Sequence, residues 1–308
     1  SAMYFVEGFM GYFKIENVNY KYPLEEKQAL KNINIEIKKG EFWAVIGKNG
    51  SGKTTFCNML RRFVPDFYKG ELTGKITLED KELKDYSQKE LVQKIGFVFQ
   101  NPFTQISGVK DTVFEEIAYG LENLGLEKEE IISKVEKILK MLEIEKLRDR
   151  NPYDLSGGQK QRVALASIIA MDPDILVIDE PTSQLDPKGT EDIFKIINLM
   201  ANEGKTIILV EHKLELIAEY AENILVLDEG EIILSGKASE VLNNKILMEK
   251  EIGMTQYSML AYELEKARKT KFEEIPITKE KAVEVFAHKN FLAEDSKIEE
   301  NTCQEEEK

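Results

Sequence analysis

The N-terminal part of the chain alternates apolar and polar residues. Both "YFKIENVNY" and "LKNINIEIKKG" have this period of two, which places apolar side chains on one face of a strand. We therefore expect half-buried, antiparallel strands there. The segment "EFWAVIG" that follows is a continuous apolar run, as expected for a strand covered on both faces.

Further apolar runs of the buried-strand kind occur at "KIGFVF", "DILVID" and "TIILVE". Segments with helical periodicity separate them, such as "TEDIFKIINLMANEG", which ends at a glycine. Strands that alternate with helices predict an α/β fold with a parallel sheet. The segment "NILVLDEGEIILSG" predicts a hairpin that turns at residues 228–230 and adds an antiparallel pair, so the core sheet is expected to be mixed.

The same pattern divides the chain into parts. Residues 101–170 carry no strong strand signal, so a helical subdomain is expected as an insertion in a main domain over residues 11–238. Short amphipathic segments predict a small C-terminal helical domain over residues 239–290. Residues 291–308 are rich in carboxylates and are expected to form an acidic, disordered tail. Residues 1–10 are interpreted as a tag remnant and N-terminal extension.

Composition narrows the class of protein. The 308 residues carry a net charge of -14, which argues against nucleic acid as a partner, because such binding relies on neutralising phosphates with Lys and Arg. Two cysteines with no metal-ligand spacing suit a reducing cytosol. No apolar run approaches the roughly 20 residues that span a bilayer. We expect any work at a membrane to go through another subunit.

The stretch "GKNGSGKTT" fits the phosphate-loop pattern G-x-x-x-x-G-K-[ST] and lies between an expected strand and an expected helix. Glycines let backbone N–H groups turn toward an anion, and the helix N-terminus adds favourable partial charge. Lys53 would meet the β- and γ-phosphates, and the Thr54 hydroxyl would ligate Mg²⁺. The predicted ATP-binding residues of the loop are Gly47, Asn49, Gly50, Ser51, Gly52, Lys53, Thr54 and Thr55.

Two carboxylates end the apolar run of "ILVIDEPTSQLD". Burying two carboxylates costs free energy unless they bind a cation or form hydrogen bonds. We expect Asp179 to hold Mg²⁺, directly or through water, and Glu180 to polarise the attacking water as general base. The alternative is two solvated loop acids. Asp186 can be an N-cap before Pro187 or a dimer contact, and both interpretations stay open.

A second glycine-rich helix start occurs at "LSGGQKQRVALA". Ser156 and Gln159 have the spacing of a capping box, which explains a helix there but not why Gly157 and Gly158 both lack side chains. The stretch resembles the signature motif of ATP-binding-cassette (ABC) ATPases, and the resemblance spans Phe13 to Gly236. It implies a P-loop nucleotide fold, ATP and Mg²⁺, and two cassettes that pack head to tail.

In that arrangement the signature of one chain covers the nucleotide of the other. The implied contacts to the partner's nucleotide are Ser156, Gly157, Gly158 and Gln159. The resemblance also implies that Tyr22 stacks on adenine, with Tyr20 as the alternative. It further implies that Gln100 senses Mg²⁺ and the attacking water, and that His212 contacts the γ-phosphate. Gln184 departs from the glycine that many relatives have before Leu185.

Within this family, "FQNPFTQISGVKDTVFEEIAYGLENLG" and "VEHKLE" resemble ATPase subunits of energy-coupling-factor (ECF) transporters, which import vitamins or cobalt and nickel ions. The implied partners are a second cassette, identical or related, a transmembrane coupling subunit and a substrate-binding membrane subunit. The implied location is the cytoplasmic face of the membrane. The alternatives are another class of importer, a nucleic-acid-associated ABC ATPase, or an ATP-gated subunit without turnover.

Overall fold

The computed structural model describes residues 12–268 and 271–288. The chain separates into two compact units, and each is described by itself. The first comprises residues 1–212 and 222–235, and the second comprises residues 213–221 and 236–308. None of the helices in the described ranges has the length and apolar character needed to span a membrane. The residues expected to form the N-terminal extension (1–10) and the acidic tail (291–308) lie outside the described ones.

A six-stranded sheet forms the centre of the first unit, in the order β10-β9-β3-β8-β7-β6. Neighbouring strands from β9 to β6 run parallel, as expected from the alternation of strands and helices. Every residue of β3, β7 and β8 is buried. The strands are β3 (Phe42–Ile46), β6 (Ile95–Val98), β7 (Ile175–Asp179), β8 (Thr206–Val210), β9 (Asn223–Asp228) and β10 (Glu231–Lys237).

The hairpin predicted at residues 228–230 joins β9 to β10. Only Glu229 and Gly230 connect the two strands, with φ of 47° and 83°. A two-residue connection of this kind, with both residues in the left-handed region, joins antiparallel strands. The sheet is therefore mixed, as predicted.

A second, antiparallel sheet has the order β2-β1-β4-β5. The inner strand β1 buries Phe13 and Ile15, and then Val18 and Tyr20. The predicted period of two holds within each pair, and an irregularity in the pairing with β2 between Ile15 and Val18 shifts it by one residue. The strands β4 and β5 were not predicted from the sequence. The strands are β1 (Phe13–Lys21), β2 (Leu30–Ile37), β4 (Glu71–Leu78) and β5 (Lys81–Glu82).

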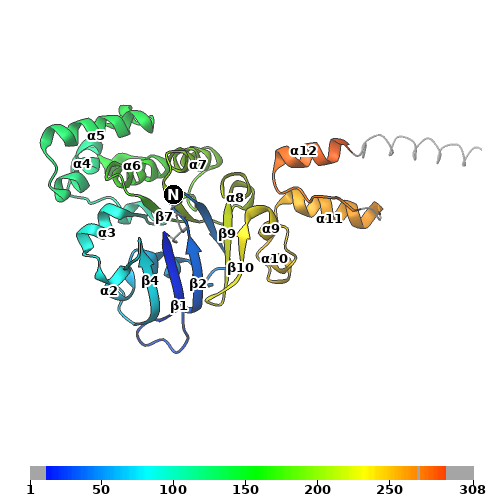
Figure 1. The fold of residues 1–308 in the computed structure, drawn as a ribbon. Helices are drawn as coiled ribbons and strands as arrows, with labels where there is room; N and C mark the ends of the chain where they lie inside the picture. The colour runs from blue at the N-terminus through cyan, green and yellow to red at the C-terminus, as the bar shows by residue number, and fades with distance from the viewer. Residues whose placement is uncertain (1–11, 269–270, 289–308) are drawn as a thin grey trace, which may run out of the picture. The chain divides into compact units, whose positions relative to one another are not determined.

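In Figure 1, α4, α5, α6 and α7 lie at the top of the first unit, above the antiparallel strands β1, β2 and β4. α4, α5 and α6 contact one another, and they lie in the chain between β6 and β7 with no strand among residues 101–170. The fold class is therefore confirmed. The helices of this unit are α1 (Lys53–Leu60), α2 (Phe63–Asp66), α3 (Gln88–Lys94), α4 (Val113–Leu124), α5 (Lys128–Met141), α6 (Gly157–Ala170) and α7 (Pro187–Asn202), with short 3₁₀ turns at Leu83–Asp85, Pro102–Thr104, Glu145–Leu147 and Pro152–Asp154.

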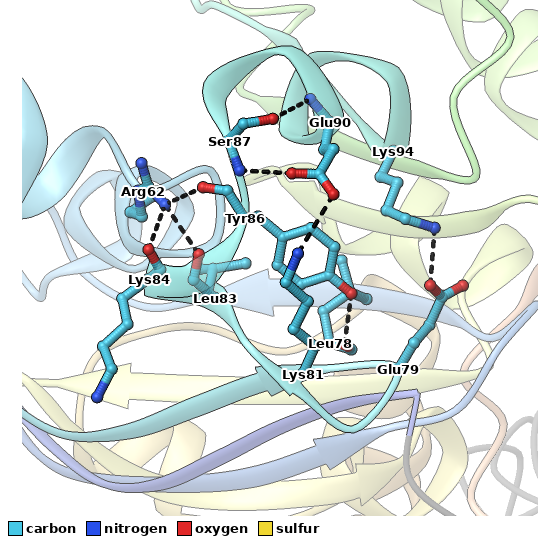
Figure 2. A network of polar contacts seen from close by, with 10 residues as sticks. All are labelled: Arg62, Leu78, Glu79, Lys81, Leu83, Lys84, Tyr86, Ser87, Glu90 and Lys94. Carbon is cyan, nitrogen blue, oxygen red and sulfur yellow. Dashed lines mark hydrogen bonds and ion pairs between the residues drawn. The ribbon is translucent and has the colours of Figure 1, made fainter.

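A polar network fixes the segment that leads into β6 (Figure 2). Arg62, in the short turn between α1 and α2, donates to the carbonyls of Leu83, Lys84 and Tyr86 at 2.6–3.1 Å. Ser87 and Glu90 then cap α3 in a reciprocal capping box. Since β6 follows α3 directly, this network ties the start of that strand to the helix after the phosphate loop.

The second unit is helical where it is described, with α8 (Leu214–Tyr220), α9 (Ala238–Leu242), α10 (Ile246–Glu249), α11 (Gln256–Arg268) and α12 (Lys279–His288). The buried Ser258 hydroxyl lies 3.0 Å from each of three groups, the Thr255 hydroxyl, the Asn243 amide oxygen and the Pro276 carbonyl. This hydroxyl therefore ties the start of α11 to two neighbouring segments. The domain boundaries given in the sequence analysis stay predictions.

Candidate active site

The phosphate loop connects β3 to α1, in the strand–loop–helix context that the motif predicts. Gly52 precedes the helix with φ of 106°. At Gly47, with φ of 150°, an added Cβ would lie 2.2 Å from the Leu227 carbonyl oxygen. No side chain fits there, so glycine is required for the loop to lie against β9.

Lys53 is buried in this loop. Its Nζ donates to the carbonyl oxygens of Gly47 at 2.9 Å and Lys48 at 3.0 Å. Burial lowers the pKa of Lys53, while the charges of Glu180 and Asp179 raise it. The ammonium group is thus held inside a loop whose geometry favours anions.

A cleft of about 500 Å³ opens beside the loop. Tyr22 lies on it, with its hydroxyl 3.1 Å from Thr55 Oγ1. Tyr20 is fully buried and bonds the Lys69 carbonyl through its hydroxyl, so its ring face is not open to a ligand. The lining residues are Tyr22, Ala29, Asn49, Gly50, Gly52, Lys53, Thr54, Thr55, Gln100 and Glu180.

Glu180 lies at the edge of the cleft between two other predicted residues. Its Oε2 accepts from Gln100 Nε2 at 2.8 Å, and its Oε1 lies 2.8 Å from His212 Nε2. The three residues follow β6, β7 and β8, which are adjacent parallel strands. Glu180 has φ of 44°, and the left-handed region costs a non-glycine residue about 1–2 kcal/mol. Strain of this kind is common where the surroundings fix a functional side chain.

Asp179 is buried at the end of β7. Burial raises its pKa to about 6, and the charge of Glu180 adds to that, while a hydrogen bond with Thr54 and the charge of Lys53 lower it. Asp179 Oδ1 has no hydrogen-bond partner among the described residues. Thr54 bonds Asp179, and Thr54 and Gln100 both line the cleft. Carboxylate, hydroxyl and amide oxygens are hard donors suited to Mg²⁺, so Asp179, Thr54 and Gln100 fit that ion.

The glycine-rich start of α6 is not among the residues that line the cleft. Ser156 caps the helix in a reciprocal capping box with Gln159, as predicted. A Cβ added at Gly157 would meet no atom of the described chain within 4 Å, and one at Gly158 would meet only Leu185, at 3.9 Å. Packing in the described part of the chain therefore does not require either glycine.

Asp186 is the N-cap of α7. Its Oδ1 accepts from the Gly189 N–H at 2.7 Å, and Pro187 occupies the first helical position. The N-cap interpretation is confirmed, and the dimer contact stays a prediction.

Two buried groups beside the site were not predicted from the sequence. Thr182 follows Glu180 by two residues, and Glu211 precedes His212. The Thr182 hydroxyl donates to Glu211 Oε2 at 2.7 Å. The available signal was a carboxylate placed directly after the apolar run "TIILV".

Comparison with known proteins identifies the family of this chain. Residues 30–183 match the family described as "ABC transporter". The chain is 43% identical over 258 residues to the energy-coupling factor transporter ATP-binding protein EcfA2 of Clostridium perfringens. The aligned residues cover 82% of this chain and 89% of that protein.

Two solved structures give the same result. One is cbiO1 of Clostridium perfringens, part of the ABC transporter complex cbiONQ (34% identity, TM-score 0.69, 84% of this chain and 99% of that one). The other is the ATP-binding cassette MJ0796 as a dimer bound to ADP and Pi (32% identity, TM-score 0.63, 73% and 98%). The chain therefore belongs to the family of ABC transporter ATPases, which hydrolyse ATP, and resembles the ATP-binding subunits of ECF-type transporters.

Proposed function

We propose that two cassettes close around ATP, hydrolyse it and thereby drive an ECF-type importer of vitamins or transition-metal ions. The observation that carries the proposal is the position of Glu180. Its carboxylate lies at the cleft of the phosphate loop, and Gln100 and His212 each bond one of its oxygens.

The roles follow from the chemistry of these side chains. Lys53 and the loop N–H groups hold the β- and γ-phosphates. Glu180 accepts a proton from the attacking water, and His212 orients Glu180 and contacts the γ-phosphate. Gln100 positions the water from the other side. Tyr22 offers its ring to the adenine. Thr54 and Asp179, with Gln100, would hold Mg²⁺, which would supply positive charge next to the phosphates.

The open start of α6 supports pairing of two chains. Gly157 and Gly158 leave a helix N-terminus without side chains, which favours an anion. A two-fold, head-to-tail pair would place this end over the γ-phosphate of the partner. The cassette MJ0796, which this chain resembles, is a dimer with ADP and Pi bound, and this supports pairing of two chains. Asp186 would lie at that interface, and the partner can be a second copy or a related cassette.

The membrane role rests on resemblance. One relative is an ECF transporter ATP-binding protein, and another is part of the complex cbiONQ. These relatives support assembly with a transmembrane coupling subunit and a substrate-binding membrane subunit. The chain would then act at the cytoplasmic face of the membrane, with the coupling subunit near Gln100.

Replacing Glu180 tests the proposal. Glu180→Gln should abolish phosphate release, because the amide cannot accept the proton, and should leave ATP binding intact. The variant should also accumulate as an ATP-bound pair, measured by size-exclusion chromatography with light scattering. Turnover close to that of the unaltered chain, or a variant that stays single at saturating ATP, would contradict the proposal.

A further inference from the structure

Glu211 is a buried carboxylate for which the proposed mechanism has no use. It follows β8 directly, and 3% of its surface is exposed. Burying a carboxylate is costly unless both oxygens are paired. Oε2 accepts from the Thr182 hydroxyl at 2.7 Å, and Oε1 accepts from the backbone N–H of His212 at 3.0 Å. The carboxylate thus joins two separate segments.

Each of these segments carries one of the proposed catalytic groups. Thr182, 1% exposed, belongs to the turn that begins at Glu180. This turn is closed by the bonds from Ser183 N–H to the Glu180 carbonyl at 3.3 Å and from Leu185 N–H to the Thr182 carbonyl at 3.2 Å. The other segment presents His212, whose side chain is 45% exposed.

Because the His212 side chain is partly exposed, its position depends on how firmly the backbone at this residue is held. Its imidazole meets Glu180 at the cleft, and β8 ends at Val210, two residues earlier. The Glu180 N–H donates to the Val210 carbonyl at 3.0 Å, so the backbones of the two segments are bonded to each other there. The bond from the Thr182 hydroxyl to Glu211 is a further link between the two segments, made by two buried side chains.

We propose that Glu211 is a positioning residue that fixes His212 against the turn of Glu180 and Thr182. It is buried and acts through the His212 backbone and the Thr182 hydroxyl. This inference rests on the proposed roles of Glu180 and His212. Loss of the carboxylate should leave ATP binding in place and lower the rate of hydrolysis.

The test compares Glu211→Leu with Glu211→Gln. The leucine variant removes both acceptors, and kcat should fall roughly 10-fold to 100-fold, as expected for misplaced catalytic groups, while KM for ATP changes less than about 3-fold. The glutamine variant keeps an acceptor for the His212 N–H and a group that can donate to the Thr182 hydroxyl. It should recover most of the rate.

Thr182 supplies a second route to the same result. Thr182→Val keeps the shape and removes the hydroxyl, so it should lower kcat in the same way, and Thr182→Ser should restore it. The double variant Glu211→Leu with Thr182→Val should cost no more than the worse single variant, because both remove the same contact. Tyr86→Phe is the matched control: it removes a buried hydrogen bond to the Leu78 carbonyl in the antiparallel sheet and should lower the melting temperature without changing kcat.

Two outcomes would overturn the inference. One is an unchanged kcat in Glu211→Leu and Thr182→Val. The other is a loss of kcat that follows melting temperature and ATP affinity in proportion, with no recovery in Glu211→Gln. Glu180→Gln and His212→Ala run beside them separate the two proposals. If these stay active, the proposed function fails together with this inference. If they lose turnover and Glu211→Leu does not, this inference alone fails.

Discussion

Asp179 and Glu180 are adjacent in the chain, yet their carboxylates have different surroundings. Asp179 is buried, its pKa is raised to about 6, and one of its oxygens has no partner among the described residues. Glu180 reaches the cleft and bonds Gln100 and His212. Two neighbouring acids in different surroundings can take different chemical roles. Here the surroundings favour Asp179 as a cation ligand and Glu180 as a proton acceptor.

The unpartnered oxygen of Asp179 leads to a prediction about metal removal. In EDTA, Asp179→Asn should raise the melting temperature by a few degrees, since it removes a buried, incompletely paired charge worth about 1–3 kcal/mol. With Mg²⁺ and ATP the unaltered chain should have the higher melting temperature, because ligand binding stabilises it and does not stabilise the variant. Differential scanning calorimetry in both buffers measures this. A variant less stable than the unaltered chain in EDTA would contradict it.

At the scale of elements, the capping box of α3 predicts a pH effect. Hydrogen bonds with Ser87 and then Lys81 lower the pKa of Glu90 to about 2 (Figure 2). A pKa lowered in the folded state contributes stability above the usual value of 4.5, and this contribution is lost as pH falls toward 2. Glu90→Gln should therefore lower the melting temperature at pH 7, and its difference from the unaltered chain should narrow as the pH falls from about 5.

The matched control is the same substitution in a Ser87→Ala background. Without the capping hydroxyl the native state favours the Glu90 carboxylate less, so Glu90→Gln should cost less and depend less on pH. A melting-temperature difference that stays constant between pH 7 and pH 3 would disprove the role of the carboxylate.

The elements with a strong apolar pattern were predictable from the sequence. The runs that became β3, β7 and β8 are buried along their whole length, so they appear in the sequence as unbroken apolar stretches. β4 was missed because it is buried mainly at Ile76 and Leu78. A strand that is exposed at most positions carries little periodicity.

The site was predicted residue by residue, but its contacts were not. Gln100 lies 80 residues from Glu180, and His212 lies 32 residues from it. Periodicity locates strand ends, whereas the order of strands in the sheet decides which ends meet. The bond between Glu211 and Thr182 could not be predicted for the same reason. It joins two loops that are far apart in the sequence, and neither loop has a sequence pattern that indicates the contact.

At the scale of the whole molecule, a head-to-tail pair predicts complementation between variants. Glu180→Gln and Gly157→Glu should each be inactive alone, the second with ATP binding by the single chain intact. In a mixed pair, one site carries both defects and the other carries none. Random mixing makes about half of the pairs mixed, so it should restore about a quarter of the original turnover.

Phosphate release from equimolar mixtures, titrated against each variant alone, measures this recovery. Restored turnover would mean that identical chains share their sites. No recovery would contradict a pair of identical chains. A related cassette that restores turnover when added to Gly157→Glu would then identify the pair as a mixed one.

The open glycines at the start of α6 also affect how variants of this protein should be screened. An added Cβ at Gly47 meets a carbonyl oxygen at 2.2 Å, whereas one at Gly157 meets nothing within 4 Å in the described chain. A survey scored by folding alone would rank Gly47 among the least tolerant positions and Gly157 among the most tolerant. Gly157→Ala should even stabilise the single chain by about 0.5 kcal/mol, which chemical denaturation can measure. Selection for activity of the pair would then retain Gly157, whereas selection for the stability of the single chain alone would favour its replacement.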